Sequence, residues 1–265
     1  MFFAEREMYD FLVSVAFHVC VFFTALEITR SVPNAVRIMS LSHSWVVSVA
    51  TVATVPHLMA SLSKDHWIGH EALPPHFGYV FKALSFSIAY FAVDLIIMAT
   101  HASCRTTSLV VHHTLIGATF TYAWFTGAYA PVLFAFLGEE ISTIFLNLRE
   151  LINKRSTVLN VSFALSFFLC RTLGGSFLYA FAVKITPEDA GLVARVMIAV
   201  GFATRLLNLF WLLLIVRAGM RASSPRSKRS TLPRSRESIF LDRHRTELVG
   251  LTQRLQSPPR PTEAQ

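Results

Sequence analysis

Charged residues are scarce in this sequence, at 15% of 265 residues, whereas hydrophobic residues make up 53%. Soluble domains carry about a quarter charged residues, so this composition excludes an ordinary soluble protein. Cysteine is also rare: the three cysteines have no spacing typical of a zinc site or a disulfide framework. We therefore expect an integral membrane protein, and we expect neither a metal nor a cofactor.

Apolar stretches occupy most of the chain, and each holds about 20 or more residues, enough to cross a hydrocarbon core of about 30 Å as a helix. Transmembrane strands would be about half as long and would alternate strictly. The sequence therefore predicts an all-α polytopic membrane protein with seven transmembrane helices. They are expected at Met8 to Ile28, Leu41 to Leu62, Tyr79 to Thr100, Thr107 to Gly127, Ala130 to Ile152, Val158 to Lys184 and Leu192 to Arg217.

Basic residues occur in the first, third and fifth loops (Arg30, Arg37, Arg105, Lys154 and Arg155). The tail, 218–265, adds ten basic residues against four acidic ones. Because Lys and Arg accumulate on the cytosolic side, we expect the N-terminus in the lumen or outside and the C-terminus in the cytosol. The tail is rich in Ser and Pro, which predicts disorder and attraction to anionic lipid head groups, with no role in nucleic-acid binding.

The predicted helices carry ionisable groups that hydrocarbon tolerates only when neighbouring helices cover them, at roughly 2.5–3.5 kcal/mol per group. These groups are Asp94, His112, His113, Glu139, Glu140, Arg171 and Arg205. A rise of about 1.5 Å per residue places the aspartate and the histidines near the cytosolic end and the arginines deeper. Thr143 and Asn147 share the helix face of Glu140, and Asn208 shares that of Arg205. The sequence therefore predicts a polar interior.

Each of these groups also has a structural interpretation. Arg171 and Arg205 are expected to form ion pairs with Glu139 or Glu140, because an unpaired buried charge is costly. For Asp94 with His112 or His113, three interpretations stay open: a proton-transfer pair, a weak metal site, or a tie between helices. The histidines around the second loop are expected to be solvated or interfacial (His43, His57, His66, His70 and His76).

The order and spacing of these groups resemble the TLC domain family. The resemblance rests on Asp94, His112-His113, the run Glu140-Ile141-Ser142-Thr143, Arg171, and Asn208 with Trp211. It covers roughly 36–217, which leaves 1–35 as an N-terminal helix with its loop and 218–265 as the tail. The family comprises multi-pass proteins, mostly of the endoplasmic reticulum, and includes the ceramide synthases. The resemblance implies a six-helix bundle around a central cavity, preceded by one extra helix.

Two functions follow from the resemblance. Ceramide synthases combine a histidine pair with a His-Asp-x-x-Asp-x-x-x-Glu run, and here its polar positions read Glu139, Glu140, Thr143 and Asn147. Three polar groups of that run are replaced, and the form here is similar to a non-synthase branch. The first function is therefore to bind, sense or move membrane lipid, as a contribution to lipid homeostasis.

The second function is an acyltransferase resembling ceramide synthase, which would use acyl-CoA. In it His112, His113 and Asp94 would be catalytic, with the histidine pair as general base. For either function, the polar cavity is expected to consist of Asp94, His112, His113, Glu139, Glu140, Thr143, Asn147, Arg171, Arg205 and Asn208.

Overall fold

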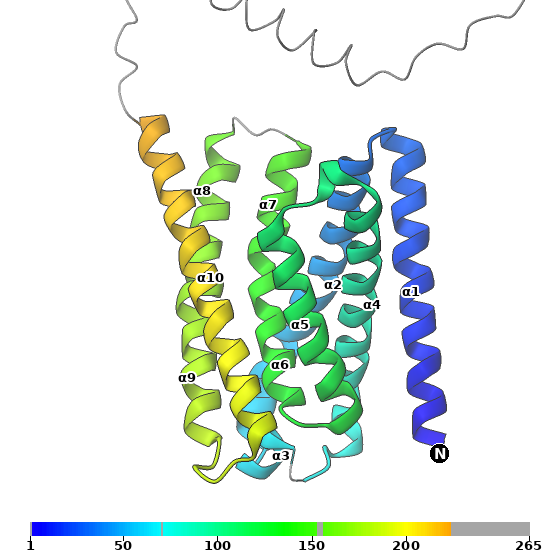
Figure 1. Ribbon diagram of the computed structural model, residues 1–265, viewed down its shortest axis with the longest axis vertical. Coiled ribbons are helices and arrows are strands. Elements are labelled where there is room, and N and C mark those ends of the chain that lie inside the picture. The colour runs from blue at the N-terminus through cyan, green and yellow to red at the C-terminus, as the bar shows by residue number, and fades with distance from the viewer. Residues whose placement is uncertain (1, 70, 153–155, 224–265) are drawn as a thin grey trace, which may run out of the picture. The chain divides into compact units, whose positions relative to one another are not determined.

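The computed structural model describes residues 2–69, 71–152 and 156–223, and its helices are connected by short turns, with no strand among these residues (Figure 1). Residues up to Gly219 form one compact unit, and the account below concerns this unit. The expected disordered tail falls almost entirely outside the described residues. The all-α class is confirmed.

The helical segments follow one another along the chain with these bounds: α1 Phe2–Thr29, α2 Val32–Ser61, α3 Lys64–Ile68, η1 Pro75–Phe77, α4 Tyr79–Thr100, η2 Ala102–Cys104, α5 Thr107–Thr126, α6 Ala130–Phe136, η3 Leu137–Glu140, α7 Ile141–Leu151, α8 Thr157–Ser166, η4 Phe167–Gly174, α9 Gly175–Ile185 and α10 Leu192–Ser223. Segments α6, η3 and α7 form one membrane-length rod, as do α8, η4 and α9. The η4 segment is a π-helical stretch.

Six of the described helical rods are long and apolar enough to span a membrane: Met8–Thr29, Val32–Ser61, Pro75–Thr100, Ala130–Leu151, Thr157–Ile185 and Leu192–Met220. The remaining expected span is α5, a helix of 20 residues that packs against α4 and α6. It is not among these six rods, and it carries His112, His113 and five threonines. Both histidines lie on the buried face of α5, which explains how a helix of this composition is accommodated.

The second helix begins earlier than the sequence predicted. We expected it to start at Leu41, but α2 starts at Val32, with a proline in its first turn. Proline suits the first turn because its fixed φ is already helical and its missing N–H has no partner there. Ala35 and Met39 are fully buried, so this first part of α2 packs into the bundle. Arg37, expected in a loop, therefore lies on a helix.

The turn between α5 and α6 is tight, in agreement with the predicted spans, which end at Gly127 and resume at Ala130. Gly127 ends α5 in the left-handed region at φ +78°, and Tyr129 precedes α6 at φ +57°. A left-handed backbone is costly for tyrosine. The Tyr129 hydroxyl lies 2.9 Å from the Thr186 Oγ1, just after α9, and this hydrogen bond holds the turn in place.

The bundle places helices that are distant in sequence side by side. Helix α1 packs against α4 and α2, α2 packs against α7, and α4 packs against α5. The turns between α1 and α2 and between α4 and α5 lie at one end of the unit, opposite to the N-terminus of α1 (Figure 1). Polar side chains of α2, α4, α5, α7 and α10 are buried between these helices.

Candidate functional site

A polar cavity of about 540 Å³ opens between α2, α4, α5, α7, η4 and α10, and we call it the polar chamber. It lies toward the end of the bundle that carries the α1–α2 and α4–α5 turns, because Pro33 and Ser103 are among its lining residues. The predicted site residues that line it are Asp94, His112, His113, Glu140, Thr143, Asn147 and Arg171. The expected convergence of polar groups from separate helices is therefore observed.

Asp94 and His113 form a close pair at the chamber wall. The Asp94 Oδ2 lies 2.9 Å from the His113 Nδ1, and the two side chains are 2% and 7% exposed. The imidazole also contacts the rings of Tyr90 and Phe91, which fix its plane. A carboxylate at one ring nitrogen sets the orientation and tautomer of a histidine, which leaves Nε2 for chemistry. Of the two candidate partners of Asp94, the structure selects His113.

His112 has a different environment. Its ring contacts Trp211 of α10 edge to face, with the ring centroids 5.3 Å apart. Its Nδ1 is buried and has no hydrogen-bond partner among the described residues. A buried polar atom without a partner costs about 1–3 kcal/mol, so such an atom beside a cavity indicates a site for a ligand group.

Glu140 and Arg171 form a second polar layer. The Arg171 Nη2 lies 3.0 Å from the Glu140 Oε1 and donates a hydrogen bond to Thr143, and its Nε donates to Ser142. The other carboxylate oxygen of Glu140 accepts from Ser44 on α2. Arg171 lies in the π-helical η4 segment, and such segments occur frequently at functional sites.

Glu139 pairs with the second arginine. The Arg205 Nη2 lies 2.5 Å from the Glu139 Oε1, and Asn208 donates to Oε2 at 3.0 Å. Gly175 makes this approach possible, because a Cβ there would overlap the Arg205 guanidinium and the Glu139 carboxylate. The sequence predicted that each arginine pairs with a glutamate, and both pairs are confirmed.

Asn147 and Asn208 complete the predicted set. Asn147 lines the polar chamber and donates to Ser40 of α2 at 3.0 Å, so it also ties α7 to α2. Asn208 is buried and serves Glu139. Its side chain supports the ion pair between Glu139 and Arg205 and does not line the polar chamber.

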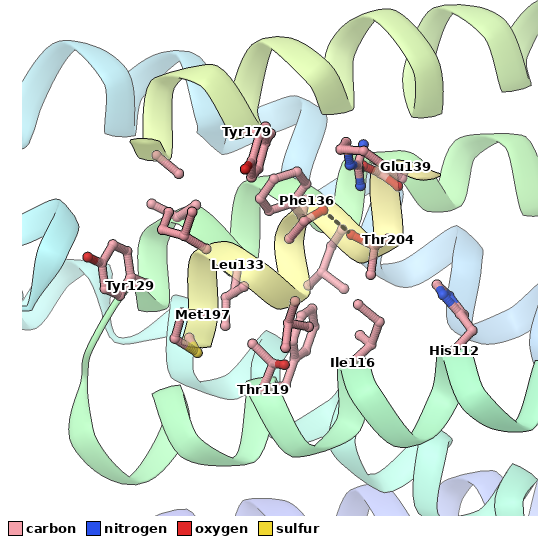
Figure 2. Close-up of a pocket in the computed structure, with 18 of the residues that line it drawn as sticks. His112, Ile116, Thr119, Tyr129, Leu133, Phe136, Glu139, Tyr179, Met197 and Thr204 are labelled. Carbon is pink, nitrogen blue, oxygen red and sulfur yellow. Dashed lines mark hydrogen bonds and ion pairs between the residues drawn. The ribbon is translucent and has the colours of Figure 1, made fainter. Parts of the chain in front are cut away.

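A second, narrow cavity of about 80 Å³ continues from the chamber toward the other end of the bundle, and we call it the apolar channel. Figure 2 shows His112 and Glu139 near one end of it and Tyr129 near the other. Between them the wall is mainly apolar and includes Ile116, Leu133 and Met197. His112, Glu140 and Arg171 line both cavities, so the polar chamber and the apolar channel adjoin at these residues.

Sequence reasoning missed several contributors. Ser40, Ser44 and Ser142 are hydrogen-bond partners of the predicted residues, but serine is too common in such helices to be recognised alone. The expectation for His43 was wrong: it is fully buried, stacked on Tyr90 with the ring centroids 4.1 Å apart, because it lies inside α2, distant from the second loop. His70 lies outside the described residues.

The architecture and the residues that line the chamber agree with a comparison to known protein families. A family model, the TLC domain, matches residues 33–217. Because the match covers well over half of the chain, the protein belongs to the TLC domain family, a family of membrane proteins associated with lipid. No curated protein matches the sequence, and no solved structure matches it.

Proposed function

We propose that this protein binds a membrane lipid, with the head group in the polar chamber and the first part of an acyl chain in the apolar channel. Sensing or moving that lipid would be its contribution to membrane lipid homeostasis. The observation that carries the proposal is the junction of the two cavities at His112, Glu140 and Arg171. A lipid has the same division, with a polar group joined to an apolar chain, and ligand sites are commonly apolar with a few placed polar groups.

The polar groups at this junction suit a head group that carries hydroxyl or amide hydrogen bonds. Glu140 and Arg171 neutralise each other, so the layer has no net charge to repel a neutral head group. The His112 Nδ1 offers an unused hydrogen-bonding position beside the cavity. We also propose that the basic tail, 218–265, attracts anionic lipid head groups.

A second candidate is an acyl-CoA-dependent lipid acyltransferase, and the Asp94–His113 pair favours it. A histidine held by a carboxylate is the arrangement that a general base needs to take a proton from an amine or hydroxyl acceptor. In this candidate His113 is the base, and His112 contacts the acyl donor or the acceptor.

We also propose that the protein resides in the endoplasmic reticulum, with the N-terminus in the lumen and the C-terminus in the cytosol. Arg30 lies in the α1–α2 turn and Arg105 in the α4–α5 connection, and both connections are on the side where the polar chamber lies. The chamber would then face the cytosolic leaflet, in agreement with the preference of Lys and Arg for that side.

The test is to purify the full chain in mild detergent and identify co-purified lipid by mass spectrometry. Ile116→Trp places a large ring in the channel, and it should reduce bound lipid several-fold, since it fills the space for an acyl chain. Val111→Trp on the same helix is the matched control, because Val111 is exposed on the outer surface and the substitution should leave the lipid content unchanged.

The two candidates are separated by a turnover assay with a panel of acyl-CoA donors and lipid acceptors. Turnover that His113→Ala abolishes would reject binding alone. Bound lipid without turnover across the panel would reject the acyltransferase. Purified protein without lipid, whether or not Ile116 is replaced, would contradict the lipid-binding proposal, and the absence of turnover as well would contradict the acyltransferase.

A further inference from the structure

A third cavity, of about 460 Å³, lies at the opposite end of the bundle from the mouth of the polar chamber, and we call it the end pocket. Its walls come from the start of α1, the segment before α4, the first turns of α4 and the end of α5. No residue of the predicted site lines it. Asp10 on α1 is outside the 33–217 match, so the end pocket is built partly by a helix that the family domain does not include.

Two buried donors in the end pocket have no partner. The Ser85 side chain is fully buried and Trp124 is 7% exposed. Neither the Ser85 Oγ nor the Trp124 Nε1 makes a hydrogen bond to any described residue. Since buried donors are nearly always satisfied, two orphaned donors at one cavity indicate that a ligand with acceptor atoms occupies it.

The charges at the end pocket are of both signs. Asp10 and Lys82 line it, and no ion pair joins them to each other or to another described residue. An anion with acceptor oxygens would satisfy Lys82, Ser85 and Trp124 together, and a cation would satisfy Asp10. Aromatic walls also favour a quaternary or primary ammonium group, through attraction of the cation to the ring face.

The surroundings indicate a lipid. The end pocket is lined by the first two turns of α4 and the last turn of α5, and the ends of membrane-length helices are where lipid head groups are expected. Beside it, Leu12 and Val13 of α1 and Phe125 of α5 are exposed on the outer surface, where acyl chains would lie. A polar hollow bordered by such a surface suits a head group whose chains stay in the bilayer.

We infer that the end pocket binds the zwitterionic head group of a membrane phospholipid. Lys82, Ser85 and Trp124 hold the phosphate, and Asp10 holds the ammonium. This site is distinct from the polar chamber, and its occupancy does not depend on the function proposed above. Because phosphatidylglycerol has a neutral glycerol where phosphatidylcholine and phosphatidylethanolamine have an ammonium, it leaves Asp10 without a cationic partner, and the site favours the two zwitterionic lipids.

The experiment uses the full chain, delipidated in detergent and mixed with phosphatidylcholine and phosphatidylglycerol of identical acyl chains, with bound lipid counted by native mass spectrometry. The unaltered protein should retain phosphatidylcholine preferentially. Lys82→Met should lower its retention about tenfold, because a charged hydrogen bond is lost. Asp10→Asn should remove the preference over phosphatidylglycerol, and Trp124→Phe should lower retention several-fold by removing one donor.

Matched controls test whether lipid retention depends on the position of the lysine and the tryptophan or only on the loss of such a residue anywhere in the chain. Lys64→Met and Trp45→Phe remove the same groups at positions that do not line the end pocket, and they should leave retention unchanged. Exchanging the charges, with Asp10→Lys and Lys82→Asp together, should recover part of the retention that either single reversal loses, since a zwitterion can bind in the opposite direction. Recovery also shows that the single variants lose binding for a reason other than misfolding.

Three results would overturn the inference: equal retention of both lipids by the unaltered protein, unchanged retention in Lys82→Met and Asp10→Asn, or no recovery in the exchanged variant. Displacement by soluble phosphocholine at the same concentration as lipid would also overturn it, because the site would then bind a free metabolite.

Discussion

The deeper polar layer, which lies where the chamber adjoins the apolar channel, and the layer nearer the mouth of the chamber contain similar side chains with different partners. In the deeper layer, each glutamate has its own arginine: Glu139 pairs with Arg205, and Glu140 pairs with Arg171. In the layer nearer the mouth, one carboxylate orients one imidazole, and the neighbouring His112 keeps an unused nitrogen. A layer in which each carboxylate has its own arginine stabilises the bundle, whereas the His112 Nδ1, which lies beside a cavity without a counter-charge, is available to a ligand. The predictions below test this difference.

The largest effect on stability is expected in the deeper layer. Arg171→Met leaves Glu140 buried without its counter-charge, which should cost about 3–5 kcal/mol of unfolding free energy. Combining it with Glu140→Leu should cost less than the sum of the two single changes, because the pair is then removed together. Unfolding in mixed detergent measures both. Additive losses would contradict the pairing, and Arg195→Met at an exposed position is the control, with a change within about 0.5 kcal/mol.

A smaller loss of unfolding free energy is expected when a side chain is added close to the same layer. Gly175→Ala puts a methyl group where the Arg205 guanidinium and the Glu139 carboxylate meet. The pair must shift, at about 1–3 kcal/mol, as for overpacking in other cores. The control is Gly191→Ala, where nothing lies within 4 Å of the added Cβ. Equal stability of the two variants in the same unfolding assay would show that the Arg205 and Glu139 side chains do not lie close to Gly175.

The smallest effect on stability is expected at the layer nearer the mouth. Asp94→Asn keeps the shape of the side chain and a hydrogen bond to His113 but removes the charge, at a cost of about 1 kcal/mol. Asp94→Asn should nevertheless reduce bound lipid or turnover, and by more than its small loss of folded protein can explain. Should stability fall as far as in Arg171→Met, with lipid content unchanged, the two layers would not differ in role.

The sequence predicts much of this organisation because membrane energetics leave few alternatives. Helix length and apolar composition locate the spans, and the cost of a buried charge predicts that Arg171 and Arg205 pair with glutamates. Which histidine pairs with Asp94 is not predictable, since His112 and His113 are adjacent and only the packing of α4 on α5 decides. The π-helical register at Arg171 has no sequence signal. His43 was misassigned because it was grouped with the histidines of the second loop, although it lies in the first half of α2, far from the end of that helix.

The most direct test uses Cys104, which lines the polar chamber, as a reporter. In a protein with Cys20→Ser and Cys170→Ser, Cys104 is the remaining thiol, and a water-soluble maleimide measures its accessibility. If lipid fills the polar chamber, delipidation should raise the labelling rate and added lipid should lower it again, while Ile116→Trp should abolish this protection. A labelling rate that is the same with and without lipid would contradict the account.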